Sequence, residues 1–367
     1  MADPEVYPEV AVTGSPVVVF AYKTDRCDEL DIPDAALRAY RRADGMIVGF
    51  STHFPNRRLV GSSISDLKRD CRVVYQGRHD PDPAAFDDRT WIAATWTEDG
   101  TTVSALGHNE YQADKFPGRC RFKDYRSCWY NSIVPLSSTD AGYSFSRMDR
   151  QHLDLIAAAP FPSDVGQGEP RGYMNPTNII FDGRYYYALV YQTGIPGVPP
   201  GECLMRTSKP EESANWTIYD GTDFVPFGKS PYEHGTQHPP CQTIHGLNGE
   251  IGSIGRLANS DLFVAFTIAS HASIPEGGAV DVAFSKDLLS WSGRKPILNV
   301  RPGWVKGPAK GWRYHYVSVV DDRDPGRNFD QIGTAASLFI VRLSCVDGET
   351  MVRDLIRMPI SLRPASR

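Results

Sequence analysis

Short apolar runs rich in β-branched and aromatic residues recur along the chain, and polar turn residues separate them. Stretches with the 3.6-residue period of an amphipathic helix are nearly absent, so the pattern predicts strands. The runs form five units, each with two apolar strands followed by a hairpin rich in Ser, Asp and Trp. The strand pairs cover residues 35–54, 90–111, 178–192, 249–270 and 314–344, and the hairpins cover residues 60–75, 128–148, 204–219, 281–294 and 349–362.

A turn signal recurs at the same place in four of the units. The four turns are Ala43-Asp44-Gly45, Glu98-Asp99-Gly100, Phe181-Asp182-Gly183 and Asn259-Ser260-Asp261. Five four-stranded repeats predict an all-β fold, a five-bladed β-propeller, in which radial repetition leaves only short, protected sheet edges. A large β-sandwich is the alternative, and the regular recurrence of the hairpin favours the propeller.

The whole chain, 1–367, is predicted to be one propeller domain. The fifth unit is one strand short, and the apolar run at residues 16–22 is expected to supply that strand and close the ring. The expected blades cover approximately residues 30–80, 88–155, 170–228, 245–300 and 310–365.

Composition excludes several classes of partner. Charged residues make up 23% of the chain, the formal net charge is -5, and no stretch gathers many Lys or Arg, which argues against nucleic acid. No run approaches 18 apolar residues, so no membrane-spanning helix is expected. The N-terminus shows no basic and apolar signal segment. The protein is therefore expected either to stay inside the cell or to have lost a signal before the first residue given.

The seven cysteines favour the second alternative. Cys120 and Cys128 flank a short polar loop without zinc-ligand spacing, so a local disulfide is expected there. Cys27 with Cys71 and Cys203 with Cys241 are expected to pair similarly, which leaves one thiol, Cys345. Because such pairs persist mainly in oxidising compartments, the protein is predicted to be secreted or periplasmic. The alternative is seven reduced thiols.

Two short motifs carry a family resemblance. The stretch Ser138-Thr139-Asp140-Ala141-Gly142-Tyr143-Ser144-Phe145 resembles the Asp box of sialidases, and Ser285-Lys286-Asp287-Leu288-Leu289-Ser290-Trp291 is similar to a hairpin of five-bladed glycosidases of the arabinanase, invertase and levansucrase kind. In both motifs the Asp is expected to tie the turn through backbone N–H groups, and the aromatic residue to pack between blades. The resemblance implies a fold and says nothing direct about chemistry.

The propeller geometry gives a rule for which side chains meet. Residues at or just before the start of first strands, and residues at the ends of second strands, surround one pocket at the channel mouth. The rule predicts Asp34, Asp31, Glu110 and His108 as catalytic residues. The predicted substrate-binding residues are Arg38, His53, Tyr111, Trp129, Arg171, Tyr173, Asn178, Glu250, His271, Arg313, Tyr314 and His315. Asn175 and Tyr316 fall in the same mouth without an assigned role.

A glycoside hydrolase is the first hypothesis, because cleaving a glycosidic bond requires one carboxylic acid and one carboxylate. Glu110 is the expected acid, since His and aromatic neighbours in a partly dry mouth raise the pKa of a carboxyl group. The resemblance implies a catalytic Asp at the start of the first inner strand, which Asp31 or Asp34 matches. It also implies an acid on a later inner strand, a placement that Glu169 or Glu250 fits better than Glu110. The expected partner is an oligo- or polysaccharide.

Two other functions use the same residues. A polysaccharide lyase acting on uronates needs His or Tyr as base and acid, and Arg or Asn to neutralise the carboxylate. A lectin-like binder needs only the aromatic and Arg side chains. No cofactor is expected, although Asp321, Asp322 and Asp324 are candidates for a structural calcium site in an otherwise solvated loop. His234, His238 and His245 match no common zinc spacing.

Overall fold

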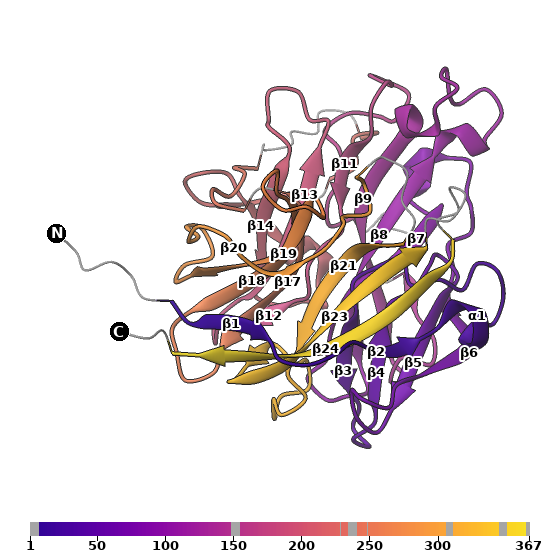
Figure 1. Ribbon diagram of the computed structural model, residues 1–367. Coiled ribbons are helices and arrows are strands. Elements are labelled where there is room, and N and C mark those ends of the chain that lie inside the picture. The colour runs from indigo at the N-terminus through magenta and orange to yellow at the C-terminus, as the bar shows by residue number, and fades with distance from the viewer. Residues whose placement is uncertain are drawn as a thin grey trace.

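The computed structural model describes residues 7–147, 155–227, 229–233, 241–247, 249–305, 311–344 and 351–364. These residues are built mainly from β-strands (Figure 1). The described helices are short: α1 (Tyr22–Asp25) and the 3₁₀ turns η1 (Pro83–Ala85), η2 (Ala113–Lys115), η3 (Tyr125–Cys128) and η4 (Ser213–Asn215). None of them is long and apolar enough to cross a membrane.

The strands group into five consecutive units, as the sequence pattern predicts. Unit one is a four-stranded antiparallel sheet with the strands in chain order. Its strands are β3 (Arg38–Arg41), β4 (Ile47–Phe50), β5 (Asn56–Gly61) and β6 (Lys68–Tyr75). The expected turn lies between β3 and β4, where Gly45 has a φ of 83° that suits glycine.

Units two and three share one ten-stranded sheet, because β11 pairs antiparallel with β13 and parallel with β9. Unit two contains β7 (Arg89–Trp96), β8 (Val103–Gln112), β9 (Trp129–Ser138) and β10 (Ser146–Arg147). Unit three contains β11 (Arg171–Met174), β12 (Ile180–Phe181), β13 (Tyr186–Thr193), β14 (Gly201–Thr207), β15 (Thr217–Tyr219) and β16 (Phe224–Pro226).

Units four and five complete the series. Unit four contains β17 (Ile251–Leu257), β18 (Phe263–Ser270), β19 (Gly278–Ser285) and β20 (Lys295–Asn299), with β22 (Gln331–Ile332) added in parallel to β17. Unit five contains β21 (Trp312–Val320), β23 (Ala335–Ser344) and β24 (Arg353–Arg363). Two N-terminal strands, β1 (Glu9–Val12) and β2 (Val17–Phe20), both pair antiparallel with β24. The prediction that residues 16–22 add a strand to the last unit is therefore confirmed (Figure 1).

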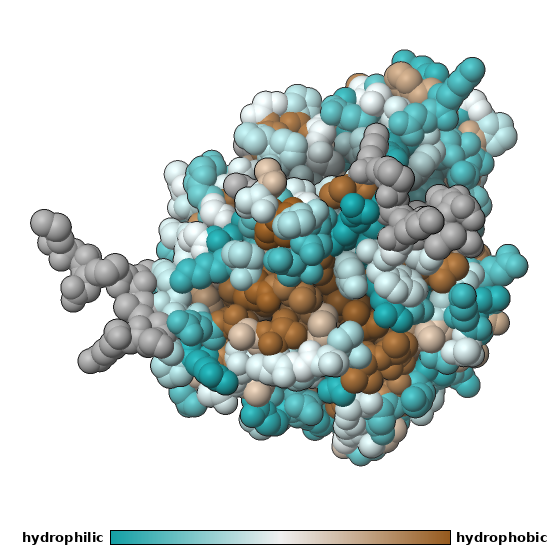
Figure 2. Space-filling view, in the orientation of Figure 1, coloured by the Kyte–Doolittle hydropathy of each residue, from teal (hydrophilic) through white to brown (hydrophobic). Residues whose placement is uncertain are grey.

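The hydrophobic core lies between neighbouring units. One cluster of buried residues joins units one and two, and further clusters join two with three, three with four, and four with five. A fifth cluster packs Phe339 and Leu355 of unit five against Leu37 and Leu59 of unit one. The order of these interfaces is circular. Apolar residues also gather on one face between the strands of unit four and β24 (Figure 2).

The two predicted Asp turns have the expected hydrogen bonds. The Asp140 carboxylate accepts the backbone N–H of Ser144 at 2.9 Å, and Asp287 accepts that of Ser290 at 2.7 Å. The aromatic residue of the first turn, Phe145, packs edge-on against Phe50 of unit one, with ring centroids 5.7 Å apart. These turns therefore fasten hairpins and contribute to the packing between units.

Candidate functional site

Asp34 lies just before β3 and is the centre of a buried polar cluster. Its carboxylate accepts a hydrogen bond from the Tyr316 hydroxyl at 3.0 Å and pairs with the Arg353 guanidinium. The His53 imidazole lies 3.5 Å from the other carboxylate oxygen. Burial by itself raises the pKa of Asp34, but Arg353, His53 and Tyr316 outweigh it and hold the pKa below its ordinary value. Asp34 is therefore ionised at neutral pH.

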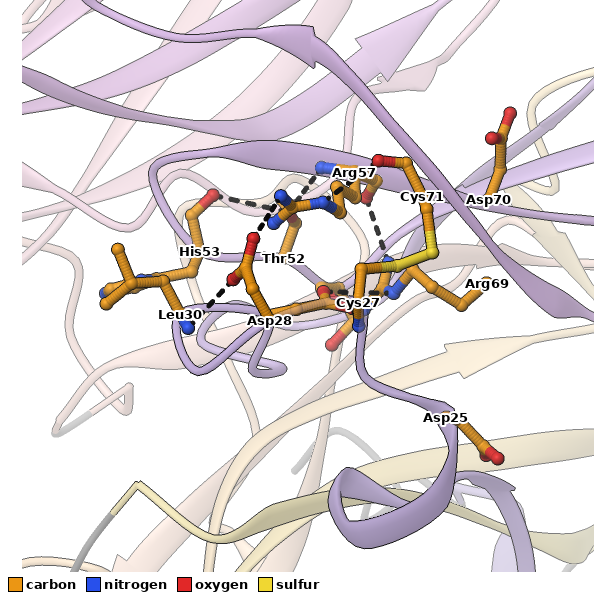
Figure 3. Close-up of polar contacts among 12 residues, drawn as sticks. Asp25, Cys27, Asp28, Leu30, Thr52, His53, Arg57, Arg69, Asp70 and Cys71 are labelled. Carbon is orange, nitrogen blue, oxygen red and sulfur yellow. Dashed lines mark hydrogen bonds and ion pairs between the residues drawn. A yellow bond between two sulfur atoms is a disulfide. The ribbon is translucent and has the colours of Figure 1, made fainter.

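The segment that carries Asp34 is fixed from several sides (Figure 3). A disulfide joins Cys27 to Cys71 of β6. Arg57 of β5 pairs with Asp28 at 2.5 Å and donates to the Cys71 carbonyl at 3.2 Å. Asp31 pairs with Arg69 at 3.1 Å and accepts the Cys27 N–H at 3.0 Å. Asp31 thus holds the segment in place, and its carboxylate is committed to these partners.

Glu110 and His108 lie two residues apart on β8 and share one face of the strand. The Gln112 amide donates to Glu110 at 2.9 Å, while His108 Nε2 lies 2.9 Å from Asn131 Oδ1 and 3.9 Å from a Glu110 oxygen. Burial raises the pKa of Glu110 to about 8, and the negative charge of Asp34 adds to this. Burial lowers the pKa of His108 to about 4. At neutral pH the carboxyl group is therefore mostly protonated and the imidazole is uncharged.

Glu250 lies just before β17 and is the third carboxyl group of the cluster. Burial raises its pKa to about 7, although a hydrogen bond to Asn175 and the charge of Arg38 favour the ionised form. Asn175 also hydrogen-bonds His108, so it connects the Glu250 and Glu110 sides of the site. Glu250 lines a cavity with Trp304, His315 and Tyr316. Three further residues of units four and five complete its lining.

Arg38 of unit one donates hydrogen bonds to three other units. Its guanidinium donates to the backbone carbonyls of Ala93 at 2.7 Å, Pro176 at 2.9 Å and Gly252 at 2.9 Å, which belong to units two, three and four. Burial lowers the pKa of Arg38 to about 9, against the influence of Glu250. Four guanidinium N–H groups of Arg38 are thus occupied by backbone carbonyls, which gives Arg38 a structural role; its role in substrate binding stays a prediction.

Backbone strain coincides with the cluster. Tyr316 and Asn175 have φ values of 55° and 49°, in the left-handed region that non-glycine residues rarely adopt. Tyr316 sits in a bulge of β21, where the pairing register shifts between His315 and Ser318. A bulge re-aims side chains, and here the Tyr316 hydroxyl reaches Asp34. Strain of this kind is typical of functional sites.

The structure brings together part of the predicted set. Asp34, His53, His108, Glu110, Glu250 and His315 are connected by hydrogen bonds, ring contacts, a shared cavity or mutual effects on their pKa values. Trp91, which the sequence did not single out, bridges two of them, with its ring 5.5 Å from His53 and 5.9 Å from His108.

The other predicted residues contact neighbours outside this cluster, and their roles in substrate binding stay predictions. Tyr111 stacks on Phe116 with ring centroids 5.3 Å apart, and Tyr173 is 3% exposed and packs on Phe227, so Tyr173 offers no open ring face to a sugar. The remaining residues lie in other contacts: Arg171 pairs with Glu169, Asn178 bonds the backbone of Ile254, His271 pairs with Asp281, Trp129 packs near Tyr125, Tyr314 borders the core between units four and five, and Arg313 lies in β21.

Arg353 is the main residue that the sequence reasoning missed. It lies at the start of β24, whereas the convergence rule considered only first and second strands. Asn175 and Tyr316 were placed in the mouth without a role. The Asn-Pro dipeptide at Asn175 was a signal for an unusual backbone there.

The candidate metal sites receive no support from the geometry. Among the described residues, no group of three or more His, Cys, Asp or Glu side chains could hold a metal ion. Asp321 and Asp324 are 3% and 4% exposed, which corrects the expectation of a solvated loop. Their carboxylates accept the backbone N–H groups of Gly333 at 2.8 Å and Gln331 at 3.0 Å. His234, His238 and Cys345 lie outside the described residues.

Disulfides form at all three predicted pairs: Cys27 with Cys71, Cys120 with Cys128, and Cys203 with Cys241. The first closes a loop between the segment before Asp34 and β6, and the second closes the loop between β8, which carries Glu110, and β9. The third fastens β14 to the segment that leads to Glu250. The bridges therefore stabilise the segments around the carboxyl cluster.

Comparisons with known proteins identify the fold. No family model and no curated protein sequence matches the chain. A solved structure described as a glycoside hydrolase matches with a TM-score of 0.50 and 11% identity, over 97% of this chain and 91% of the other. A variant of the α-L-arabinanase of Cellvibrio cellulosa matches with a TM-score of 0.50 and 11% identity, over 89% and 90% of the two chains. The chain thus has the five-bladed propeller fold of arabinanase-like glycoside hydrolases.

Proposed function

We propose that the protein is a glycoside hydrolase that acts on a plant or microbial glycan at the mouth of its propeller. The observation that carries the proposal is a buried cluster in which Asp34 is ionised while Glu110 and Glu250 have raised pKa values. Glycosidic cleavage needs this division of protonation states between two carboxyl groups. In the proposed reaction, Asp34 acts as the base or nucleophile and a protonated Glu gives its proton to the leaving oxygen.

Glu250 is the better candidate for the acid. It lines a cavity that also contains His315 and Tyr316, so a glycosidic oxygen has space to approach it. It also precedes an inner strand, which is the position that the resemblance implies for the acid. Glu110 is 8% exposed and accepts the Gln112 amide, which leaves less room for a substrate. Glu110 and His108 then set the polarity of the wall opposite Glu250.

Arabinan is the first substrate to test, because one structural neighbour is named as an α-L-arabinanase. Ring closure by the N-terminal strand, the Asp-box identity of the two Asp turns and a secreted or periplasmic location belong to the same proposal. The three disulfides support the location, since such bonds persist mainly in oxidising compartments.

The test is a glycan panel, led by arabinan, assayed for new reducing ends and for ultraviolet absorbance of unsaturated products. The hydrolase is expected to release reducing ends without new absorbance. Asp34→Asn and Glu250→Gln are expected to lower kcat by about 10²–10⁴-fold while oligosaccharide binding persists. Glu276→Gln, at an exposed loop carboxylate, is the matched control and should leave turnover unchanged.

Other outcomes would replace the proposal. New absorbance would identify a lyase, for which the uncharged imidazoles of His108 and His315 would supply the base. Glycan binding without turnover on any substrate would identify a lectin-like binder. Unchanged turnover in both carboxyl variants would remove the assigned acid and base even if the protein is a hydrolase.

A further inference from the structure

The cavity beside Glu250 is too small to hold a whole oligosaccharide. Its volume is about 20 Å³, which is the space of about one water molecule. Pockets that enclose a complete drug-sized ligand measure roughly 300–1,000 Å³. A glycan whose glycosidic oxygen reaches Glu250 must therefore lie mostly outside the cavity, across the side chains at its rim.

Trp304 stands at that rim. Its side chain lines the same cavity as Glu250 and His315, yet the residue is 48% exposed. The indole Nε1 donates to Ser270 Oγ at 3.1 Å, and the ring meets His315 at a centroid distance of 5.5 Å and an interplanar angle of 70°. The indole is therefore held by its polar edge and by a second ring. This leaves a large apolar surface open to solvent next to the carboxyl cluster.

Two side chains connect Trp304 to Asp34, the proposed base or nucleophile. His315, which it contacts, lies against Tyr316 with ring centroids 4.0 Å apart, and Tyr316 donates to Asp34. A flat apolar surface with a fixed orientation suits the C–H face of a sugar ring, because indoles combine a large apolar area with a polar edge. A fixed side chain also loses little conformational entropy when a ligand binds.

We infer that Trp304 is the stacking surface for the sugar residue adjacent to the one bound at Glu250. This inference rests on the proposed function and narrows its substrate class to glycans of at least two residues. Trp304 then determines the preference for chain length. It acts on substrate binding and has no part in proton transfer.

The test compares arabinohexaose with an aryl arabinoside that carries a single sugar. Trp304→Ala is expected to raise KM for arabinohexaose roughly tenfold, which is the effect of losing one stacking contact. On the aryl arabinoside kcat/KM is expected to change less than about twofold, because the second sugar is missing. Trp304→Phe keeps a smaller ring, so its KM for arabinohexaose should lie between that of the wild type and that of Trp304→Ala. Trp312→Ala is the matched control, since Trp312 is 36% exposed but packs against Arg342, and it should leave both substrates unchanged.

Direct binding separates the inference from the hydrolase proposal. Calorimetric titration of Glu250→Gln with arabinohexaose should give a Kd that rises roughly tenfold when Trp304→Ala is added. If this holds and the wild-type protein cleaves nothing, the Trp304 inference stands and the hydrolase proposal fails. If the wild type cleaves arabinohexaose but Trp304→Ala changes both substrates equally, or neither, the inference is wrong. If the wild type neither binds arabinohexaose nor cleaves any glycan of the panel, both are wrong.

Discussion

The pH dependence of kcat/KM can distinguish Glu250 from Glu110 as the catalytic acid. The pKa of Glu250 is raised to about 7 and that of Glu110 to about 8. The profile of kcat/KM reports ionisation in the free enzyme, which is the state to which these values refer. The productive form needs a protonated acid and an ionised Asp34. The rate should therefore fall on the basic side as the acid loses its proton.

The two pKa values give the expected size of this fall in kcat/KM. At pH 9, two units above a pKa of about 7, about one hundredth of the Glu250 side chains keep the proton, whereas about one tenth of the Glu110 side chains do. Because Glu250 is the proposed acid, we expect kcat/KM at pH 9 to be about a hundredfold below its plateau. The acidic limb should lie below about pH 4, because the pKa of Asp34 is held below its ordinary value.

The assay measures initial release of reducing ends from arabinan between about pH 3 and pH 10, at substrate concentrations below KM. Circular dichroism at each pH confirms that the protein stays folded. Glu110→Gln should leave the basic limb near pH 7, whereas Glu250→Gln should remove it along with most of the activity. A limb near pH 8 that disappears in Glu110→Gln would refute the assignment to Glu250. A profile without any basic limb would refute a carboxylic acid catalyst with a raised pKa.

Three further variants test other parts of the site. Arg38→Met removes hydrogen bonds to three units and should lower the free energy of unfolding by about 3 kcal/mol or more, measured by denaturant titration. Arg353→Met leaves burial to dominate at Asp34, so the pKa of Asp34 should rise and the acidic limb of kcat/KM should move up by about 1–3 units; an unmoved limb would contradict the pairing. Replacing Cys27 and Cys71 by Ser opens a loop with a sequence separation of 44 and should lower the free energy of unfolding by about 4 kcal/mol, measured by denaturant titration.

The repeat pattern was sufficient to predict the fold and much of the cluster. The convergence rule predicted that Asp34, His53, Glu110, Glu250 and His315 would meet, and contacts, pKa effects or a shared cavity connect them. Burial raises the pKa of Glu110, which is the direction expected for a carboxyl group in a partly dry mouth. The three cysteine pairs expected from the sequence form disulfides, which rules out the alternative of reduced thiols for these six residues.

The period of two along a strand explains which predicted residues do not reach the cluster. His108 and Glu110 share one face of β8, so Tyr111 points to the other face and packs against Phe116. The same rule would have excluded either His315 or its neighbour Tyr316. Both take part because the bulge and the positive φ of Tyr316 break the alternation. A one-residue irregularity of this kind leaves no periodic signal in a sequence.

The charge state of the site depends on a contact that no local pattern reveals. Arg353 and Asp34 are 319 residues apart, and they meet because β24 of the last unit lies against the first unit. Without that guanidinium, burial would have more influence on Asp34, and its pKa would rise towards the raised pKa values of Glu110 and Glu250. The low pKa of Asp34, on which its proposed role as base or nucleophile depends, therefore relies on the packing of the fifth unit on the first.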